Sequence, residues 1–523
     1  MARPLAEVIP GLPISPAPGT RDSWATTVVG GVRADNRLIR RGDLFAGHTG
    51  GRVHGALFAR AAVASGAVAV LTDEAGLTIL ADPAYALAEG TPVLVAPDVP
   101  AVLGRLAAEI YGRPAEQLRT FAVTGTNGKT TTCYFLEHAL AALGRSTGLI
   151  GTVEVRTRTP ELRAVPAQLT TPQPADLQAL LAEMVAEGVT DLAMEVSSHA
   201  LDLGRVDSVL YDVAGFTNLT QDHLDHHGSM EGYFAAKEAL FTPQRSAQGV
   251  SMVDDQWGQR LAASRPAGYA MSSVGTDEAN AADWQVIAAV PDGTGSRVTL
   301  RGAGQELCFT TALPGAFNVA NASLAVVMLL AAGTDPAVLE EALAHAGGLS
   351  PVIPGRMELL ATAPRVIVDF AHNPGGLAVV LSALRGSTEG RLHVVFGAAG
   401  SRDAGKRAEM AELAVRYCDE VTITDDDPHD EPAAAIRADL LGPARAAAAG
   451  SLVREIGDRR VAIRAAITGA DPADTVLIAG RGHETVQEIA GVEHHLDDRE
   501  EVRSALQASA GGAAGPGEGR SSR

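Results

Sequence analysis

The sequence predicts an α/β protein divided into three domains. Its 523 residues are too many for one hydrophobic core. Short apolar runs that end in polar residues alternate with Ala- and Leu-rich helical patterns along the chain. This alternation is typical of parallel sheets covered by helices. Two segments that contain proline and glycine, 112–118 and 350–356, separate three such blocks, and the first is a plausible linker.

The domain boundaries follow from these breaks. We place an N-terminal domain at 1–118, a central domain at 119–353 and a C-terminal domain at 354–507. The Gly-, Ala- and Ser-rich tail, 508–523, is predicted to be disordered because it has too few apolar residues to bury. In every block the chemically interesting polar residues follow strand ends, which is where open α/β sheets bind ligands.

Composition excludes several classes of protein. The formal net charge of −20 does not favour binding to nucleic acid or to anionic membranes. Three scattered cysteines without CxxC spacing argue against a disulfide framework or a cysteine zinc site. No run of 18 apolar residues predicts a membrane span, and the first residues lack a signal-peptide pattern. We therefore expect a cytoplasmic enzyme or binding protein.

One stretch predicts a phosphate-binding loop. "TFAVTGTNGKTTT" reads as an apolar strand, a glycine turn and the start of a helix, so backbone N–H groups would face an anion. Lys129 would reach the β- and γ-phosphates, and Thr130 would offer its hydroxyl to Mg²⁺. Thr124 stands where the full GxxxxGK[ST] pattern has its first glycine, and a tight turn with a surface lysine is the alternative. The loop residues are Gly125, Thr126, Asn127, Gly128, Lys129, Thr130 and Thr131.

Two further clusters could complete a nucleotide site. Glu195 follows an apolar strand, where a carboxylate can hold Mg²⁺ beside a nucleotide. The segment 217–241 holds two aspartates, three histidines and Lys237. It could be a plain polar loop, and its His-Asp-His-His run could suggest zinc. Zinc would give no reason for the phosphate loop, whereas ATP–Mg²⁺ chemistry does.

Together these motifs resemble the Mur ligases, the ATP-dependent amide-forming enzymes of peptidoglycan precursor synthesis. The resemblance runs from about residue 30 to 505 and includes "GTNGKTTT", "EVSSHALDLGRV", "DHLDHHGSM", "LPGAFNVANASLA", "VDFAHNPGGL" and "GRGHE". Within the family, the chain is most similar to the members that add the third residue of the stem peptide. The resemblance implies a P-loop ATP-binding central domain, an N-terminal UDP-binding domain and a C-terminal Rossmann-like domain.

The resemblance also implies the chemistry. A carboxylate of UDP-N-acetylmuramoyl-L-Ala-D-Glu would attack the γ-phosphate of ATP and become an acyl phosphate, which the amine of a free amino acid would then attack. Lys129, His223 and Lys237 are the expected catalytic residues. Thr130, Glu195, His223 and Lys237 would hold two Mg²⁺ ions, with Lys237 carbamylated by CO₂. A monomer is expected.

Other site residues come from matching positions in the family's motifs. Their roles are implied by the resemblance alone, and Asn318 and Asn321 could instead cap a helix. The residues implied in ATP binding besides the loop are Asn318, Asn321, Arg356, Asp369 and His372. Those implied in binding the UDP-muramoyl peptide are Asn36, Thr170, Thr171, Ser197 and Arg205. Those implied in binding the amino acid are Arg407, Asp426, Asp427, Pro428, His429, Gly480 and Glu484.

The amino-acid loop departs from the family pattern. Members that add meso-diaminopimelate read Asp-Asn-Pro-Arg where this chain reads Asp426-Asp427-Pro428-His429. The arginine that would take the distal carboxylate is gone, and "TDDDPHDE" carries five carboxylates in eight residues. We therefore expect an amino acid other than meso-diaminopimelate, with an ammonium-ended side chain such as that of lysine or ornithine.

Three alternatives remain at this stage. The chain could be a ligase of a specialised pathway that joins a different acid and amine. It could be a folylpolyglutamate synthetase, although "LTTPQP", "DHLDHHGSM" and the N-terminal block argue against that. It could be a catalytically silent nucleotide-binding subunit, which the presence of Lys129, Glu195, His223 and Lys237 disfavours.

Overall fold

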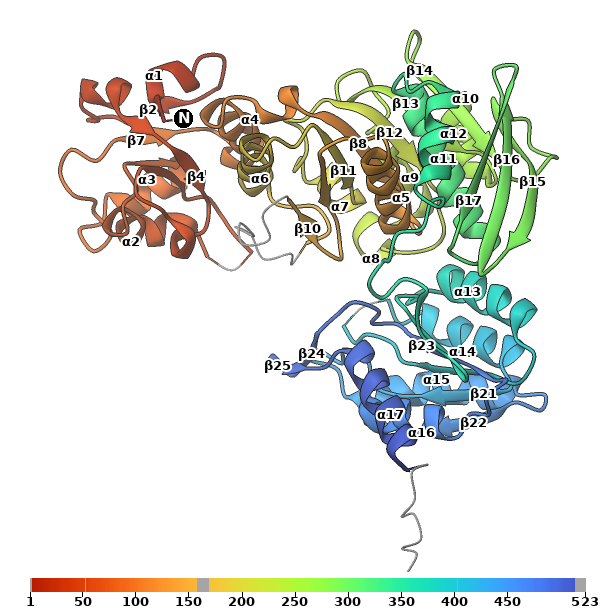
Figure 1. Cartoon of the computed structure of the whole chain (residues 1–523). Coiled ribbons are helices and arrows are strands. Elements are labelled where there is room, and N and C mark those ends of the chain that lie inside the picture. The colour runs from red at the N-terminus through yellow and green to blue at the C-terminus, as the bar shows by residue number, and fades with distance from the viewer. Residues whose placement is uncertain (1, 52, 158–168, 402, 513–523) are drawn as a thin grey trace, which may run out of the picture.

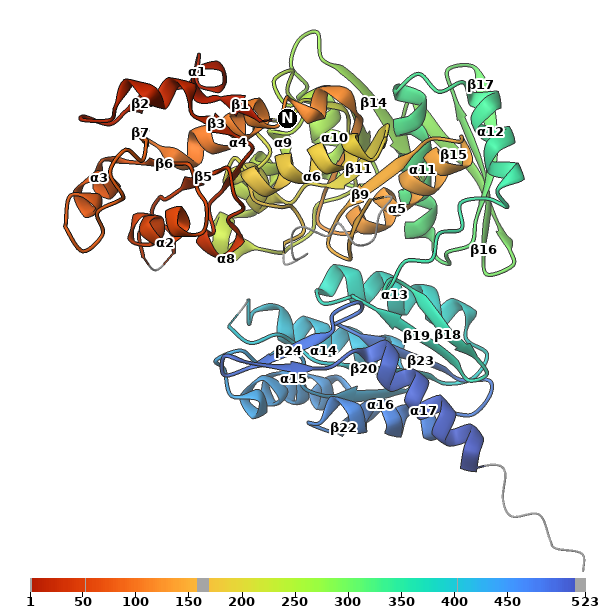
Figure 2. The ribbon, with the colours of Figure 1, turned by 60° about the vertical axis from the view of Figure 1, so that its left-hand side comes forward.

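The computed structural model describes residues 2–51, 53–157, 169–401 and 403–512. It has the three-domain α/β architecture predicted from the sequence. The N-terminal and central domains lie in a row, and the C-terminal domain lies to one side of the central domain (Figures 1 and 2). Over the described ranges, no helix is both long and apolar enough to cross a membrane.

The N-terminal domain is built on a sheet of order β2-β7-β6-β5-β4, parallel except at β2. Helix α4 is capped by Asp98, whose carboxylate accepts from the Ala101 N–H at 3.1 Å, and it buries its apolar face on this sheet. The elements are β1 (Arg3–Pro4), α1 (Leu5–Val8), β2 (Ser15–Pro16), η1 (Asp22–Thr26), β3 (Val28–Val29), β4 (Gly31–Arg33), η2 (Asn36–Leu38), β5 (Asp43–Ala46), η3 (Gly55–Phe58), α2 (Ala59–Ala64), β6 (Ala69–Thr72), α3 (Glu74–Leu80), β7 (Val93–Val95), α4 (Val99–Ile110) and η4 (Pro114–Gln117).

The central domain has a long mixed sheet of order β10-β9-β11-β8-β12-β13-β14-β15-β16-β17. Strand β8 lies between β11 and β12 and is buried on both faces, which explains its nearly continuous apolar sequence. The elements are β8 (Arg119–Thr124), α5 (Lys129–Ala142), β9 (Thr147–Ile150), β10 (Val155–Arg156), α6 (Pro174–Ala186), β11 (Asp191–Glu195), α7 (Ser198–Asp202), β12 (Tyr211–Phe216), α8 (Leu224–His227), α9 (Met230–Glu238), β13 (Ser246–Met252), α10 (Gln256–Ala263), β14 (Ala270–Gly275), β15 (Trp284–Asp292), β16 (Gly295–Gly302), β17 (Gln305–Thr311), α11 (Ala316–Ala331) and α12 (Pro336–His345).

The C-terminal domain has a sheet of order β18-β19-β23-β20-β21-β22, parallel except at β18. Both views place helix α13 on the side of this domain that faces the central domain (Figures 1 and 2). The elements are β18 (Glu358–Thr362), β19 (Arg365–Asp369), α13 (Pro374–Ser387), β20 (Leu392–Phe396), α14 (Lys406–Tyr417), β21 (Glu420–Ile423), α15 (Ala433–Ala447), β22 (Leu452–Glu455), α16 (Arg459–Thr468), β23 (Thr475–Ala479), β24 (Val486–Ile489), β25 (Val492–His495) and α17 (Asp498–Gly512).

Two local expectations differ from the structure. The segment 112–118 contains the short helix η4, and its residues Ala115 and Leu118 are buried in the core of the central domain, so it is a packed connection rather than a free linker. Helix α17 continues to Gly512, so 508–512 is helical and not disordered as predicted. The rest of the predicted tail, 513–523, lies outside the described residues.

Candidate active site

The loop between β8 and α5 has the geometry of an anion cradle. Gly125 and Gly128 have φ values of 145° and 87°, which favour glycine. A Cβ on Gly125 would lie 1.9 Å from Oγ1 of Thr217, and one on Gly128 would lie 2.3 Å from Oδ1 of Asn321. Both positions therefore exclude a side chain, and the first N–H groups of α5 face the loop without intrahelical partners.

Two lysines meet at this loop. Lys129 Nζ donates to the carbonyl oxygens of Gly125, at 3.0 Å, and Thr126, at 2.9 Å. Lys237, in α9, donates from Nζ to the same Gly125 oxygen at 2.8 Å, and its Nζ lies 4.5 Å from the centre of the Tyr233 ring. The sequence contains three lysines, and two of them meet at this one carbonyl oxygen.

The surroundings of the two lysines disfavour a second positive charge. Burial lowers the pKa of Lys129, although Glu195 and Asp222 act in the opposite direction. Burial, together with the nearby charge of Lys129, holds the pKa of Lys237 well below its usual range. Lys237 is 1% exposed, so it is not an ordinary surface lysine.

Glu195 stands at the end of β11, beside the phosphate loop. Its carboxylate accepts from the Thr152 N–H at 2.8 Å and from the Thr152 hydroxyl at 3.1 Å. The Thr152 hydroxyl oxygen also lies 3.0 Å from that of Thr170, from which it can accept. Thr130, at the first turn of α5, lies 3.5 Å from Nη2 of Arg356. A carboxylate and a hydroxyl are thus presented at the same edge of the sheet.

Three residues implied in binding the muramoyl peptide are hydrogen-bonded together. The Thr171 hydroxyl donates to the Glu195 carbonyl at 2.9 Å and accepts from the Ser197 N–H at 3.0 Å. Arg205 donates to the Thr171 carbonyl at 3.3 Å. Asn36 lies apart from them, half-buried in the short helix η2 of the N-terminal domain. A substrate that contacted Asn36 and Thr171 together would span the two domains.

His223 begins α8 with a left-handed backbone (φ 52°). Burial and the charges of Lys129 and Lys237 lower its pKa to about 4, against a partial opposing effect of Asp222. Its imidazole is therefore neutral near pH 7, the form that ligates metals. Asp222 accepts from the His223 N–H at 3.0 Å.

Asp222 is held by the C-terminal domain as well. Asn373, the N-cap of α13, donates from Nδ2 to Asp222 and to Oδ1 of Asn127, at 3.2 Å each. Burial raises the pKa of Asp222, but the charges of His223, His372 and Lys406 lower it more. His372 donates from Nδ1 to the Phe370 carbonyl at 2.8 Å. The charge of Lys406, the third lysine of the chain, thus also acts on this site.

Asn318 and Asn321 do not cap a helix. The N-cap of α11 is Gly315, and both asparagines lie buried inside the helix. Asn318 donates to the Pro314 carbonyl at 2.8 Å, and Asn321 lies against Gly128 of the phosphate loop. The alternative interpretation of these two residues is wrong for this reason.

Arg356 reaches from the C-terminal domain to Thr130 at the end of the loop, and the charge of Asp369 acts on it. The guanidinium carbon of Arg356 lies 4.1 Å from the centre of the Phe370 ring, and burial lowers its pKa. Asp369 accepts from the N–H groups of Met357, at 2.7 Å, and Ala371, at 2.8 Å. Burial raises the pKa of Asp369, and the charge of Arg356 partly offsets this.

The predicted amino-acid loop is less negative than its sequence suggests. Arg481 is fully buried, and its Nη1 lies 2.7 Å from Oδ1 of Asp427, 3.7 Å from Asp426 and 3.8 Å from Glu484. The Glu488 N–H also donates to Asp427 at 3.0 Å. The charge of Asp427, on which the expectation against diaminopimelate depended, is therefore paired.

Glu484 has a strongly raised pKa. Burial and the charges of Asp426 and Asp427 raise its pKa to about 8, although Arg481 and Arg356 oppose this. Gly480 (φ 112°) lies so close that a Cβ there would be 2.6 Å from Oδ2 of Asp426. A cationic ammonium group placed beside these carboxyl groups would favour the ionised form of Glu484.

The remaining predicted residues of this group have other partners. Arg407 pairs in two-pronged fashion with Glu431, at 2.7 Å for both Nη atoms, and with Asp439 at 2.9 Å. His429 has a left-handed backbone (φ 50°), and its Nδ1 lies 3.2 Å from Glu488. The Pro428 carbonyl accepts from the Glu431 N–H at 3.0 Å.

Sequence reasoning missed several residues of the site. Asp222 and Asn373 lie inside the quoted motifs, but nothing in their spacing shows that they meet across domains. Thr152 follows β9, one residue after Gly151, and its contact with Glu195 needs the fold. Arg481 lies inside the quoted motif "GRGHE", but its partner Asp427 is 54 residues away in the sequence.

A glycine-lined anion cradle where the central and C-terminal domains meet, faced by buried lysines and carboxylates, is the kind of site that nucleotide-dependent enzymes build. The chain belongs to the Mur ligase family, whose members are ATP-dependent amide ligases. Residues 123–329 match the Mur ligase middle domain, 355–482 the Mur ligase glutamate ligase domain, and 28–111 the Mur ligase family catalytic domain.

Individual relatives agree with this assignment. The UDP-N-acetylmuramoyl-L-alanyl-D-glutamate–2,6-diaminopimelate ligase of Corynebacterium efficiens is 46% identical over 90% of this chain and 88% of its own length. The UDP-N-acetylmuramyl-tripeptide synthetase of Leifsonia xyli subsp. xyli is 42% identical over 97% and 96%. A solved UDP-N-acetylmuramoyl-L-alanyl-D-glutamate–2,6-diaminopimelate ligase is 30% identical, with a TM-score of 0.63 over 98% of this chain and 100% of its own.

Proposed function

We propose that this enzyme adds the third residue of the peptidoglycan stem peptide, joining a free amino acid to UDP-N-acetylmuramoyl-L-Ala-D-Glu at the expense of ATP. The observation that carries the proposal is the meeting of Lys129 and Lys237 at the Gly125 carbonyl, beside Glu195 and the Thr171 network. Relatives named for this acid substrate match nearly the whole chain.

The proposed chemistry needs positive charge where phosphate charge develops. Lys129 is placed to swing from the Gly125 and Thr126 carbonyls onto the γ-phosphate, because those hydrogen bonds are easily exchanged for a charged acceptor. The substrate carboxylate would form an acyl phosphate, and the amine would displace phosphate from it. Arg356 reaches the loop from the C-terminal domain and would help hold the nucleotide.

The residues present fit Mg²⁺. Thr130, Glu195 and the neutral imidazole of His223 supply a hydroxyl, a carboxylate and a nitrogen at the edge of the loop. Mg²⁺ would neutralise phosphate charge there. These side chains would orient the nucleotide, and Thr152 would keep the Glu195 carboxylate turned toward it.

Lys237 fits the proposed carbamate for a physical reason. Its buried side chain contacts the Tyr233 ring and the Gly125 carbonyl. These surroundings favour the neutral amine, which is the form that reacts with CO₂. A carbamate would exchange a poorly tolerated second cation beside Lys129 for an anion. It would also supply a further oxygen ligand for a metal ion.

We propose that the amino acid is a diamino acid whose distal ammonium group lies beside Glu484 and Asp426. The relatives named for an amino acid are named for 2,6-diaminopimelate and give no support to the expectation that this acid is disfavoured. That expectation also assumed an unpaired Asp427, which Arg481 neutralises. The absence of an arginine at His429 is the part of the loop argument that still favours lysine or ornithine.

The experiment is an assay of phosphate release with UDP-N-acetylmuramoyl-L-Ala-D-Glu, ATP and one amino acid at a time, with mass analysis of the product. The proposal expects phosphate release to depend on both substrates and a product heavier by one amino-acid residue. A silent subunit would release no phosphate. Competition between meso-diaminopimelate, lysine and ornithine at equal concentration then ranks the amino acids, and tenfold preference for diaminopimelate contradicts the prediction from the loop sequence.

A further inference from the structure

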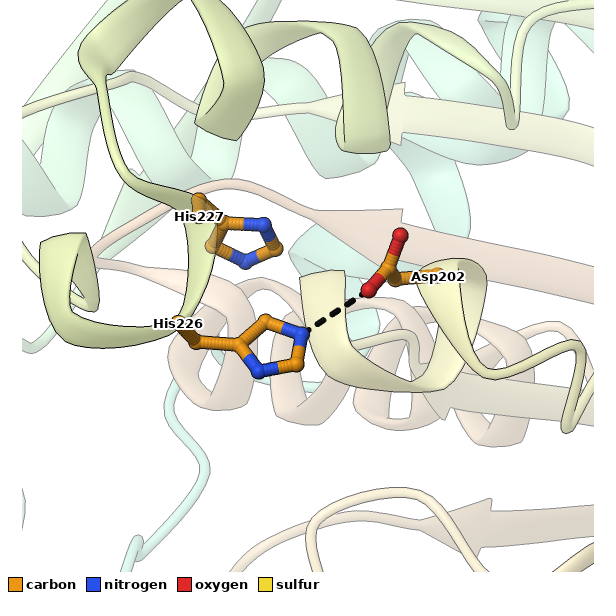
Figure 3. A group of neighbouring side chains, drawn as sticks. All are labelled: Asp202, His226 and His227. Atoms are coloured by element: carbon orange, nitrogen blue, oxygen red, sulfur yellow. Dashed lines mark hydrogen bonds and ion pairs between the residues drawn. The ribbon is translucent and has the colours of Figure 1, made fainter.

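A cluster of imidazoles lies beside the active site without a role in the proposed chemistry. Asp202 ends α7, while His226 and His227 end α8, and the three side chains converge (Figure 3). Their potential ligand atoms all lie within 4.8 Å of one another. His226 Nε2 is 2.9 Å from Asp202 Oδ2. That ion pair satisfies two of the groups, but it does not explain why a second imidazole joins them.

The cluster extends into a stack of aromatic rings. His199 of α7 lies against His226, with ring centres 4.2 Å apart and planes 31° apart. The rings of His226 and His227 are 4.7 Å apart and nearly perpendicular. His227 is supported by the Ser198 hydroxyl at 2.9 Å and by the Tyr233 ring, stacked at 5.1 Å. Packed rings hold the imidazoles in defined directions, as partners of metal-binding histidines do.

We propose that Asp202, His226 and His227 form a binding site for one divalent transition-metal ion of the zinc class, separate from the magnesium site of catalysis. Two imidazoles and a carboxylate are the ligands that Zn²⁺ takes when a fourth position is left to water. In tetrahedral ligation with bonds of about 2.0–2.2 Å, ligand atoms lie about 3.3 Å apart. Asp202 and His226 are exposed, so small rotations of their side chains can close the arrangement.

The position of the site gives it a consequence. An ion bound there would tie α7 to α8 more firmly than the exposed ion pair, the Ser198–His227 hydrogen bond and the ring contacts that already join these helices. Ser197 precedes α7 and His223 precedes α8, so the ion would fix the two short helices next to the substrate-binding and catalytic residues. The proposed magnesium site takes one imidazole, that of His223, beside oxygen ligands. Two imidazoles in one site favour zinc, so the two sites would prefer different metals.

The test is titration of the full-length protein with Zn²⁺ in excess Mg²⁺, followed by calorimetry, and with Co²⁺, followed by its visible absorption. We expect one ion to bind with high affinity. Asp202→Asn and His226→Gln should each weaken binding by about tenfold or more. His345→Gln is the matched control, because it removes an exposed histidine that bonds only its own helix, at the Glu341 carbonyl.

A second readout separates this site from other carboxylates. Zn²⁺ should slow amide hydrogen exchange in 198–202 and 224–228 of the unmodified protein and not in His226→Gln. The proposal is overturned if the unmodified protein binds no Zn²⁺, or if both cluster variants bind it as the control does. Because the readouts are binding and exchange, their failure leaves the proposed ligase activity untouched.

Discussion

Lys237 lies in surroundings very different from those of a surface lysine. It is buried, shares the Gly125 carbonyl with Lys129 and has a strongly lowered pKa. Lys237→Ala should reduce kcat by about 10²–10³-fold, the usual loss when one group that stabilises developing charge is removed. Added short carboxylic acids should restore part of the activity if a carbamate is the missing group. Phosphate release measures both effects.

The control for this variant is Arg245→Ala. Arg245 forms a surface ion pair with Asp207 at 2.6 Å, and such pairs contribute about 1 kcal/mol or less. It should keep its activity. Full activity of Lys237→Ala would contradict the assignment of Lys237 to the chemistry.

Glu484 predicts a pH dependence of amino-acid binding. Its pKa is raised to about 8 in the free protein, so the carboxyl is mostly neutral at pH 7 and ionises as pH rises. An ammonium group prefers the ionised form, so KM for the amino acid should fall between pH 6.5 and 8, by at most about tenfold per pH unit for one released proton. Glu484→Gln should flatten the profile. A profile unchanged by that substitution would exclude Glu484 as the partner.

The same shift has a consequence for stability. The unfolded carboxyl ionises near its ordinary value of 4.5, whereas the folded one stays protonated to about 8. The unfolded state therefore binds fewer protons between these values, and the contribution of Glu484 to the free energy of unfolding decreases as pH rises through this window.

Individual residues also show how much of the site could be predicted from the sequence. Lys129 and Glu195 were predicted because phosphate and metal chemistry require such groups near a loop that the local sequence encodes, whereas the roles of His223 and Lys237 were implied by the family resemblance. The pairing of Asp427 with Arg481 was not predicted, because it joins segments that only the folded C-terminal domain brings together. The expectation against diaminopimelate was drawn from the loop's five carboxylates without that pairing.

At the scale of the element, the phosphate loop depends on glycine. Gly125→Ala should abolish ATP binding, because a Cβ would collide with Thr217 Oγ1 at a φ that alanine rarely adopts. Gly386→Ala, in α13, is the matched control, since nothing lies within 4 Å of its added Cβ. Nucleotide binding by calorimetry compares the two. Equal binding would mean that the loop is not the nucleotide site.

The N-terminus of α13 links two domains. Asn373 caps this helix through the Gly376 N–H at 2.8 Å and also contacts Asn127 and Asp222. Asn373→Ala should therefore lower kcat by about tenfold or more, from the loss of two interdomain hydrogen bonds of about 1 kcal/mol each or more. It should also cost about 1 kcal/mol in stability.

Asp458→Ala separates these effects. Asp458 caps α16 in the same domain through the N–H groups of Arg460 and Val461, away from the loop. This variant should lose a similar free energy of unfolding and keep its kcat. If both variants reduce kcat equally, the contact with the central domain has no special part in catalysis.

For the whole molecule, the alternation of strands and helices was enough to predict three α/β domains. It did not predict the antiparallel extension β15–β16–β17 of the central sheet. Turn signals are present at Asp292-Gly293 and Ala303-Gly304. Apolar and polar residues alternate only weakly in the strands beside these turns, and the rest of the central block has the pattern of a parallel sheet. How the domains lie against one another could not be read from local patterns, because it depends on contacts such as that of Asn373.

We propose above all that the three domains act together to form an amide bond with the energy of ATP hydrolysis. The most direct measurement is the product of one incubation of the full-length protein with UDP-N-acetylmuramoyl-L-Ala-D-Glu, ATP, Mg²⁺ and a mixture of meso-diaminopimelate, lysine and ornithine. We predict that one phosphate is released for each UDP-muramoyl tripeptide formed, and that Lys129→Ala yields neither phosphate nor tripeptide. Phosphate release without tripeptide, or tripeptide formed without ATP, would contradict it.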